Sequence, residues 1–290
     1  MPHVSSHDGV RLYYEEAGRG LPLVFVHEFL GEIRSWEAQI RHFSRRYRCI
    51  AYNARGYPPS DVPDGPAAYG FEHQRNGLKS LLDALGVDKA HVVGLSMGAF
   101  TTFYFGMKWP ERALSLTLAG IGSGSMPQAR ESFVAESEAA ADELLSGGWE
   151  RSAEARTLTP TRVQLRNKDP RGFAEFVAMV REHSAKGSAM TLKGYQARRP
   201  ALQEFAAEMA ACSVPALIVS GDEDWPCLDA SLMLKRAMPS AGLAFLPQTG
   251  HACNLEEPAL FNLLVERFLH QVDSGQYRMR DPLAAPGRML

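Results

Sequence analysis

Three residue types that together can cleave a carbonyl compound occur in this chain in a defined order. Ser96 stands between two glycines in Gly94-Leu95-Ser96-Met97-Gly98, Asp222 and Asp224 follow a later apolar run, and His251 follows the next one. A serine hydroxyl is a poor nucleophile near neutral pH and needs an adjacent imidazole to accept its proton. The imidazole in turn needs a carboxylate that fixes its tautomer and stabilises the cation. This order of residues therefore indicates acyl transfer to serine.

The elements predicted around these residues would bring them together. HVVGLS is predicted as a strand that ends at Ser96, and MGAFTTFYFGMKWP as the helix that follows it. PALIVSG and AGLAFLPQTG are predicted as the strands that precede the acidic residues and His251. The carboxyl ends of parallel strands share one edge of a sheet, where α/β proteins bind ligands. A tight strand-to-helix turn also explains the two glycines and aims the amide of Met97 at a forming oxyanion.

The rhythm of strands and helices predicts an α/β fold. It has a mainly parallel central sheet, helices on both faces and an inserted helical cap. Residues 1–120 and 213–273 are predicted to form the core domain. Residues 121–212 are rich in Ala, Glu and Arg, contain no convincing strand and are predicted to form the cap over the sheet edge. The tail, residues 274–290, has no periodicity and is expected to be loosely ordered or to pack on a neighbouring subunit.

Bulk properties exclude several classes of protein. The 290 residues are 45% hydrophobic and 22% charged with a net charge of -2, so we expect no nucleic-acid partner and no anionic membrane surface. No apolar run approaches the roughly 18 residues of a membrane span, and the N-terminal stretch lacks the pattern of a signal peptide. The four cysteines lack metal-ligand spacing. We therefore expect a cytoplasmic protein with free thiols and no metal.

The chain resembles the α/β-hydrolase superfamily, in its branch with a serine nucleophile and a helical cap. The resemblance covers about residues 10–272 and rests on the segments HEFLG, NARGYPPS, GLSMG, GDEDWP and GHACNLEEP. It implies that Ser96 is the nucleophile, that His251 is the general base and that no cofactor is required. It implies Asp224 as the acid, with Asp222 on the same loop as the alternative. The backbone amides of Phe29 and Met97 are the implied oxyanion donors.

Two segments depart from the pattern of that superfamily. NARGYPPS has Asn53 and Pro58 where the family usually has Asp and Gly, and a structural turn is still expected there. Glu28 follows His27 where a glycine is usual. One interpretation is a carboxylate that braces the loop against Arg34 or Arg55. The other is a pocket carboxylate that disfavours anionic substrates and holds a cationic group or the hydrolytic water.

Other candidates have simpler interpretations. Glu28 and Leu95 are candidates for the substrate pocket, and His27 is expected to support its loop rather than to act in catalysis. Five further histidines are expected to be solvated: His42, His73, His91, His183 and His270. Cys227 and Cys253 are expected to fill loops beside the acid and the base. Pocket-facing residues of the cap are sought among Phe173, Phe176, Met179, Met190 and Tyr195.

The leading hypothesis is a cofactor-independent serine hydrolase that acts on a small ester, lactone or related carbonyl substrate. A serine at the nucleophile position argues against epoxide or halide chemistry, for which relatives use an aspartate. The alternatives are a cofactor-free perhydrolase or haloperoxidase, a hydrolase that cleaves a carbon–carbon bond next to a carbonyl, and a hydrolase-like ligand sensor. The expected partner is a small-molecule substrate. We consider a homodimer as the oligomeric state.

Overall fold

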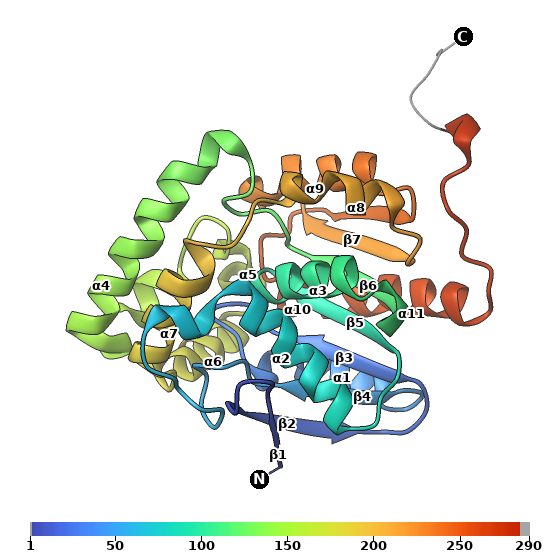
Figure 1. The fold of residues 1–290 in the computed structure, drawn as a ribbon. Coiled ribbons are helices and arrows are strands. Elements are labelled where there is room, and N and C mark those ends of the chain that lie inside the picture. The colour runs from blue at the N-terminus through green and yellow to red at the C-terminus, as the bar shows by residue number, and fades with distance from the viewer. Residues whose placement is uncertain (1, 285–290) are drawn as a thin grey trace.

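Short apolar runs separated by amphipathic stretches form a mainly parallel sheet, as predicted. The computed structural model describes residues 2–284. The strand order across the sheet is β1-β2-β4-β3-β5-β6-β7-β8 (Figure 1). The strands are β1 His3–Ser5, β2 Arg11–Ala17, β3 Pro22–Val26, β4 Arg48–Tyr52, β5 Ala90–Leu95, β6 Ala113–Ala119, β7 Ala216–Gly221 and β8 Ala241–Leu246. β2 pairs antiparallel with β1 and with β4, and the other neighbours are parallel.

Helices cover both faces of the sheet because successive strand residues point to opposite sides. In β3, Val24 and Val26 belong to one hydrophobic cluster, together with residues of α2, α3 and α9. Leu23 and Phe25 belong to a second cluster with residues of α1 and α11. These five helices are α1 Glu37–Phe43, α2 Phe71–Ala84, α3 Met97–Lys108, α9 Trp225–Ala237 and α11 Pro258–Asp273. The sheet is therefore the middle layer of three.

The segment between β6 and β7 contains helices and no strand among the described residues. Its helices are α4 Pro127–Thr157, α5 Val163–Lys168, α6 Pro170–Arg181, α7 Ala185–Thr191 and α8 Ala206–Ala211. We call residues 121–212 the helical insertion. Within α4 the backbone breaks at Gly148, whose φ of 65° is one that glycine adopts without strain. Figure 1 shows α4, α6 and α7 side by side at the left of the molecule.

The helical insertion is built into the rest of the chain by shared apolar packing. A third cluster joins Leu144, Trp149 and Phe176 of the insertion to Leu30 and Ala252, which lie on loops that follow β3 and β8. Tyr195 and Leu202, also of the insertion, belong to the cluster that contains α2 and α3. The insertion therefore shares cores with both loops and helices of the sheet layer.

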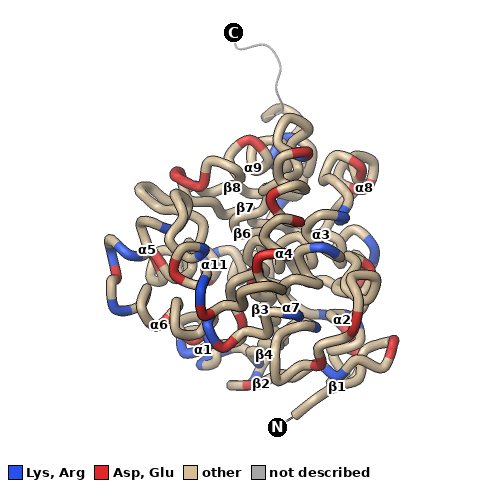
Figure 2. Tube along the Cα trace, turned by 90° about the vertical axis from the view of Figure 1, so that its left-hand side faces the viewer, with Lys and Arg blue, Asp and Glu red and all other residues tan. Residues whose placement is uncertain are grey.

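The remaining elements are short. They are α10 Cys253–Glu256, the 3-10 turns Ile33–Trp36, Pro66–Tyr69, Pro110–Arg112, Leu202–Phe205 and Pro282–Ala284, and one π turn, Leu192–Gln196. β1 was not predicted, because three residues give too short a pattern to read. Figure 2 shows acidic and basic residues mixed along the helices of the insertion. None of the helices in the described part of the chain has the length and apolar character needed to cross a membrane.

The first part of the predicted tail packs on its own chain. The Tyr277 hydroxyl donates to the carbonyl oxygens of Ala216, at 2.9 Å, and Ser240, at 3.0 Å. The Tyr277 ring also packs on Phe268 of α11, with ring centroids 5.1 Å apart. The loose order predicted for this tail is therefore wrong for Tyr277, while the contact with a neighbouring subunit stays a prediction. Residues 285–290 of that tail lie outside the described residues.

Candidate active site

Ser96 occupies a strained turn between β5 and α3. Its φ of 53° and ψ of -114° are unusual for a residue with a side chain. The Ser96 amide donates to the Ala119 carbonyl of β6 at 2.8 Å, and its own carbonyl accepts from the Phe100 amide at 3.0 Å. These two bonds hold the turn from both sides. Ser96 is partly exposed, which the proposed role of nucleophile requires.

The two glycines of the turn are required by packing. A Cβ on Gly98 would lie 2.0 Å from the Val26 carbonyl oxygen, and one on Gly94 would lie 2.3 Å from the Gly98 carbonyl oxygen. Real atoms do not approach so closely, so the start of α3 can rest against the end of β3 only with glycine at both places. This close approach brings the loop that follows β3 beside the serine.

That loop presents a free amide. The Glu28 carbonyl accepts from His27 Nδ1 at 2.7 Å and from the Gly31 amide at 3.1 Å. Because N–H and C=O of a trans peptide point in opposite directions, the Phe29 amide is turned away from these donors. No described residue accepts a hydrogen bond from it. Met97 is the first residue of α3, so its amide also lacks an acceptor inside the helix.

His27 supports this loop, as expected. Its Nε2 accepts from the Ala54 amide at 3.0 Å, so Nδ1 carries the proton and donates to the Glu28 carbonyl. Burial lowers the pKa of His27, which favours this neutral form. The ring therefore links the loops that follow β3 and β4, and neither nitrogen is free for catalysis.

His251 and Asp224 meet in the interior. His251 Nδ1 lies 2.8 Å from Asp224 Oδ2, and Asp224 is fully buried. Burial alone would lower the pKa of His251, but the charge and hydrogen bond of Asp224 outweigh it and raise that pKa. Burial alone would raise the pKa of Asp224, but the charge and hydrogen bond of His251 outweigh it and hold the pKa of this carboxyl below its usual range. The pair is therefore built as an imidazole oriented by a carboxylate.

The His251 ring lies beside the end of β5. A Cβ on Gly120 would lie 3.3 Å from a methyl carbon of Leu95 and 3.4 Å from His251 Cε1. Leu95 is the residue before Ser96, so the imidazole reaches the neighbourhood of the serine turn. The Leu95 side chain itself is only 1% exposed and belongs to the cluster with α1 and α11. The pocket role of Leu95 therefore stays a prediction.

Asp222 lies elsewhere on the same loop. Its side chain is exposed, and Oδ1 accepts from the Thr249 amide at 3.2 Å. It therefore joins the loop after β7 to the loop after β8 and does not contact His251. Of the two carboxylates that the sequence left open, the structure brings Asp224 to the imidazole.

The partner of Glu28 was not among those predicted. Glu28 is 1% exposed and forms an ion pair with Arg162, which directly precedes α5 in the helical insertion. Arg34 instead pairs with Glu32, at 2.5 Å, and with Glu182, at 2.7 Å. The predicted brace against Arg34 or Arg55 is therefore wrong, because each arginine has a nearer carboxylate. No pattern in the sequence connects Glu28 with a residue so far along the chain.

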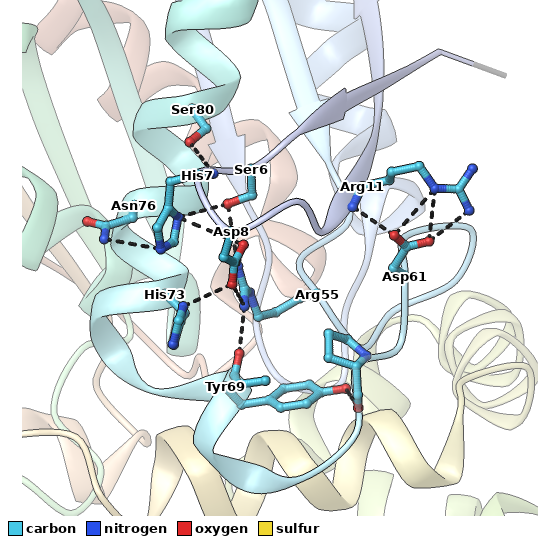
Figure 3. A network of polar contacts seen from close by, with 12 residues as sticks. Ser6, His7, Asp8, Arg11, Arg55, Asp61, Tyr69, His73, Asn76 and Ser80 are labelled. Carbon is cyan, nitrogen blue, oxygen red and sulfur yellow. Dashed lines mark hydrogen bonds and ion pairs between the residues drawn. The ribbon is translucent and has the colours of Figure 1, made fainter.

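Arg55 supports a different part of the molecule. Its guanidinium donates to both carboxylate oxygens of Asp8, at 2.7 and 2.9 Å, and to the Ala68 carbonyl (Figure 3). Asp8 also lies beside His7 and His73, and these three residues could hold a metal ion. Because both oxygens of Asp8 already accept from a buried cation, we regard this cluster as a structural tie between the β1–β2 turn, α2 and the NARGYPPS turn.

Two histidines predicted to be solvated are buried. His91 is fully buried, with Ser115 Oγ 2.7 Å from its Nδ1 and Asp273 Oδ1 2.9 Å from its Nε2. His183 packs edge-on against Tyr57 with ring centroids 5.3 Å apart, and burial lowers its pKa to about 3. Both predictions of solvated rings are wrong, because tertiary packing covers positions that look polar in the sequence.

The four cysteines are free, as expected, and all four are buried. Cys227 lies close to the site: its Sγ is 4.0 Å from His251 Nδ1 and 3.3 Å from the Gly120 carbonyl oxygen. Burial raises the pKa of this thiol, and the Asp224 charge raises it further. The group therefore stays a neutral thiol that packs under the acid–base pair.

Comparison with known proteins matches this chain to one family and to enzymes of similar length. A family described as the alpha/beta hydrolase fold matches residues 22–258. The chain is 28% identical to 3-oxoadipate enol-lactonase 2 of Acinetobacter baylyi over 252 residues, which cover 84% of this chain and 86% of that protein. It is 25% identical over 286 residues to a putative 2-succinyl-6-hydroxy-2,4-cyclohexadiene-1-carboxylate synthase of Bacillus subtilis, covering 93% and 98%.

Solved structures show the same fold. The enol-lactonase from Burkholderia xenovorans superposes with a TM-score of 0.81 at 23% identity, covering 93% of this chain and all of that one. This likeness extends through the helical insertion, since so large a share of the chain is aligned.

Proposed function

Because the chain belongs to the α/β-hydrolase fold family, we propose that it is a cofactor-independent serine hydrolase that cleaves a small ester or lactone. Ser96 would form the acyl-enzyme, with His251 as general base and Asp224 as its orienting acid. The observation that carries the proposal is the 2.8 Å contact between His251 Nδ1 and Asp224, beside a serine held at φ 53°. Such a contact leaves Nε2 as the basic nitrogen.

The reaction follows from these groups. His251 Nε2 takes the proton from Ser96 Oγ while the oxygen attacks the substrate carbonyl carbon. The oxygen of the tetrahedral intermediate becomes negative and accepts hydrogen bonds from the amides of Phe29 and Met97. When the bond between the carbonyl carbon and the leaving alcohol breaks, the alcohol oxygen takes the proton from His251. His251 then takes a proton from a water molecule as that water attacks the acyl-enzyme, and it returns the proton to Ser96 Oγ when the carboxylic acid leaves.

The helical insertion would act as the cap of this site, with the core formed by residues 1–120 and 213–273. The Thr161 carbonyl of the insertion accepts from the His251 amide at 2.6 Å, and Arg162 pairs with Glu28 beside the proposed oxyanion donor. A segment that contacts the loops of both the base and the oxyanion donor is well placed to enclose a substrate and exclude water.

Names of relatives suggest the class of substrate. An enol-lactonase relative covers most of this chain, so lactones are the first substrates to test.

The proposed location of the protein is the cytoplasm. The four buried free thiols suit a reducing compartment, which supports this location.

The test is turnover of an ester and lactone panel by the wild-type protein and by Ser96→Ala. We expect the variant to lose at least about a thousandfold in kcat, because loss of a triad member removes the nucleophile, while its circular dichroism spectrum is unchanged. The panel includes a diketone and an acetate–peroxide assay for the alternative reactions. Full hydrolytic activity in Ser96→Ala would refute the proposal, as would wild-type turnover of only the diketone or only peroxide.

A further inference from the structure

Glu28 and Arg162 form an unusually enclosed ion pair. Their side chains are 1% and 10% exposed. Among the described residues, no other pair of a Lys or Arg with a carboxylate has both side chains so covered; in the pair of Arg55 with Asp8, for example, Asp8 is 24% exposed. Removing two charges from water is costly, and hydrophobic replacements of buried pairs are often no less stable. Fold stability alone therefore does not explain this pair.

The pair lies next to the proposed reacting groups. Glu28 directly precedes Phe29, whose amide is the proposed oxyanion donor. Arg162 directly follows Thr161, whose carbonyl accepts from the His251 amide. The two charges act on the pKa of His251 in opposite directions: Arg162 lowers it and Glu28 raises it. Both charges therefore act electrostatically on the proposed reacting groups.

The pair also keeps unused polar atoms. Arg162 Nη2 contacts Glu28 Oε2, while Arg162 Nε and Glu28 Oε1 are buried without a hydrogen-bond partner among the described residues. Buried polar atoms rarely lack a partner, so each calls for an explanation. The pair therefore keeps one free donor and one free acceptor, so its geometry leaves both charged groups only partly satisfied.

We propose that Arg162 is a specificity-determining residue whose charge Glu28 cancels, so that the pair sets how well the site accepts a substrate bearing a carboxylate. This inference rests on the proposed function. With both side chains present, the pair adds no net charge to the site. Without Glu28, the guanidinium is an uncompensated cation that attracts an anionic substrate. Without Arg162, Glu28 is an uncompensated anion that repels it.

Other charged groups nearby are the same in all the variants compared. Glu256 of α10 accepts from the Gly250 and Ala252 amides, at 2.6 and 3.1 Å. Arg199 is buried with its guanidinium carbon 4.0 Å from the Phe100 ring centroid, and donates to Gln196 and to the Ser123 carbonyl. Together with Asp224, these groups set the background electrostatic potential, and the Cys227 thiol stays neutral. A ratio of activities on two substrates therefore isolates the effect of the pair.

The experiment compares kcat/KM for two para-nitrophenyl esters of equal acyl length, the neutral butyrate and the anionic hydrogen succinate. We expect Glu28→Gln to raise the ratio of anionic to neutral activity about tenfold, the effect of one neighbouring charge. Arg162→Gln should lower the ratio by a similar factor. The double variant should return it to within about threefold of wild type, because the two charge effects oppose each other. Arg162→Lys, which keeps the charge, should also stay near the wild-type ratio.

The matched control is Glu182→Gln, which removes another ion pair between the helical insertion and the loop after β3. It should leave the ratio unchanged. Equal losses on both esters in the Glu28 and Arg162 variants would overturn the inference and make the pair a brace. So would a ratio that moves in the same direction in both. Labelling of each variant by a fluorophosphonate at Ser96 shows separately whether the proposed function holds. If Arg162→Gln does not fold, the ratios of Glu28→Gln and Arg162→Lys test the inference.

Discussion

At the scale of single residues, the site combines groups that the sequence could identify with one that it could not. Ser96 and His251 could be proposed from the sequence because a turn between two glycines and the end of a predicted strand are local patterns. The choice between Asp222 and Asp224 required coordinates, since both follow the same strand. Arg162 lies 134 positions from Glu28 and in a different element, so only the folded chain brings it to the site.

Replacing the acid tests the contact with the imidazole. We expect Asp224→Asn to lower kcat about ten-thousandfold, because an amide favours the wrong tautomer of His251. Asp222→Asn is the matched control, since it changes the same atoms on the same loop, and the Asp222 carboxylate accepts from the Thr249 amide instead of His251. Its kcat should fall by no more than severalfold. Steady-state kinetics on an activated ester measures both, and a larger loss in Asp222→Asn would contradict the assignment of the acid.

The pH dependence of kcat/KM reports the same pair. In the proposed mechanism His251 must be neutral to accept the Ser96 proton, and the charge of Asp224 raises the pKa of His251 above its usual value. Activity should therefore decline on the acidic side with a midpoint above about pH 6.5, the ordinary imidazole value. Asp224→Asn removes the anion that stabilises the imidazolium, so its remaining activity should decline only at lower pH. A midpoint that stays in place in this variant would show that another group titrates.

At the scale of elements, the strands and helices of the core were largely predictable and the arrangement of the helical insertion was not. The core strands are short apolar runs followed by turn residues, and the helices between them have clear apolar faces. The insertion has amphipathic helices too, but their packing depends on loops that come from both halves of the chain. Leu30 and Ala252, which complete its hydrophobic cluster, give no local sign of this role.

At Gly250 the histidine loop lies close against the helical insertion. A Cβ there would lie 2.2 Å from the Thr161 carbonyl oxygen. Gly250→Ala should therefore displace His251 and lower kcat/KM by roughly a hundredfold, the cost of a small misplacement of a reacting group. Gly70→Ala is the control, because its new Cβ would have no neighbour nearer than the His73 ring at 4.0 Å. Equal activity in the two variants would show that the Thr161 contact does not position the base.

At the scale of the whole molecule, the helical insertion and the core should unfold together. Residues of the insertion complete two hydrophobic clusters that also contain loops and helices of the core. Removing either part would expose buried apolar surface on the other, which couples their free energies of unfolding. We expect one transition in urea, with far-ultraviolet circular dichroism and tryptophan fluorescence coinciding. Trp149 lies in the insertion and Trp36 in the core, so fluorescence samples both. Two separate transitions would show that the insertion is an independent unit.

The central claim is that Ser96 carries the acyl group during turnover. The most direct measurement is peptide mapping by mass spectrometry after rapid acid quenching of the wild-type protein with an activated ester. We predict an added acyl mass on the peptide that contains Ser96, absent when the substrate is omitted and absent in Ser96→Ala. Acylation of another residue during turnover, or sustained turnover by Ser96→Ala, would contradict the account.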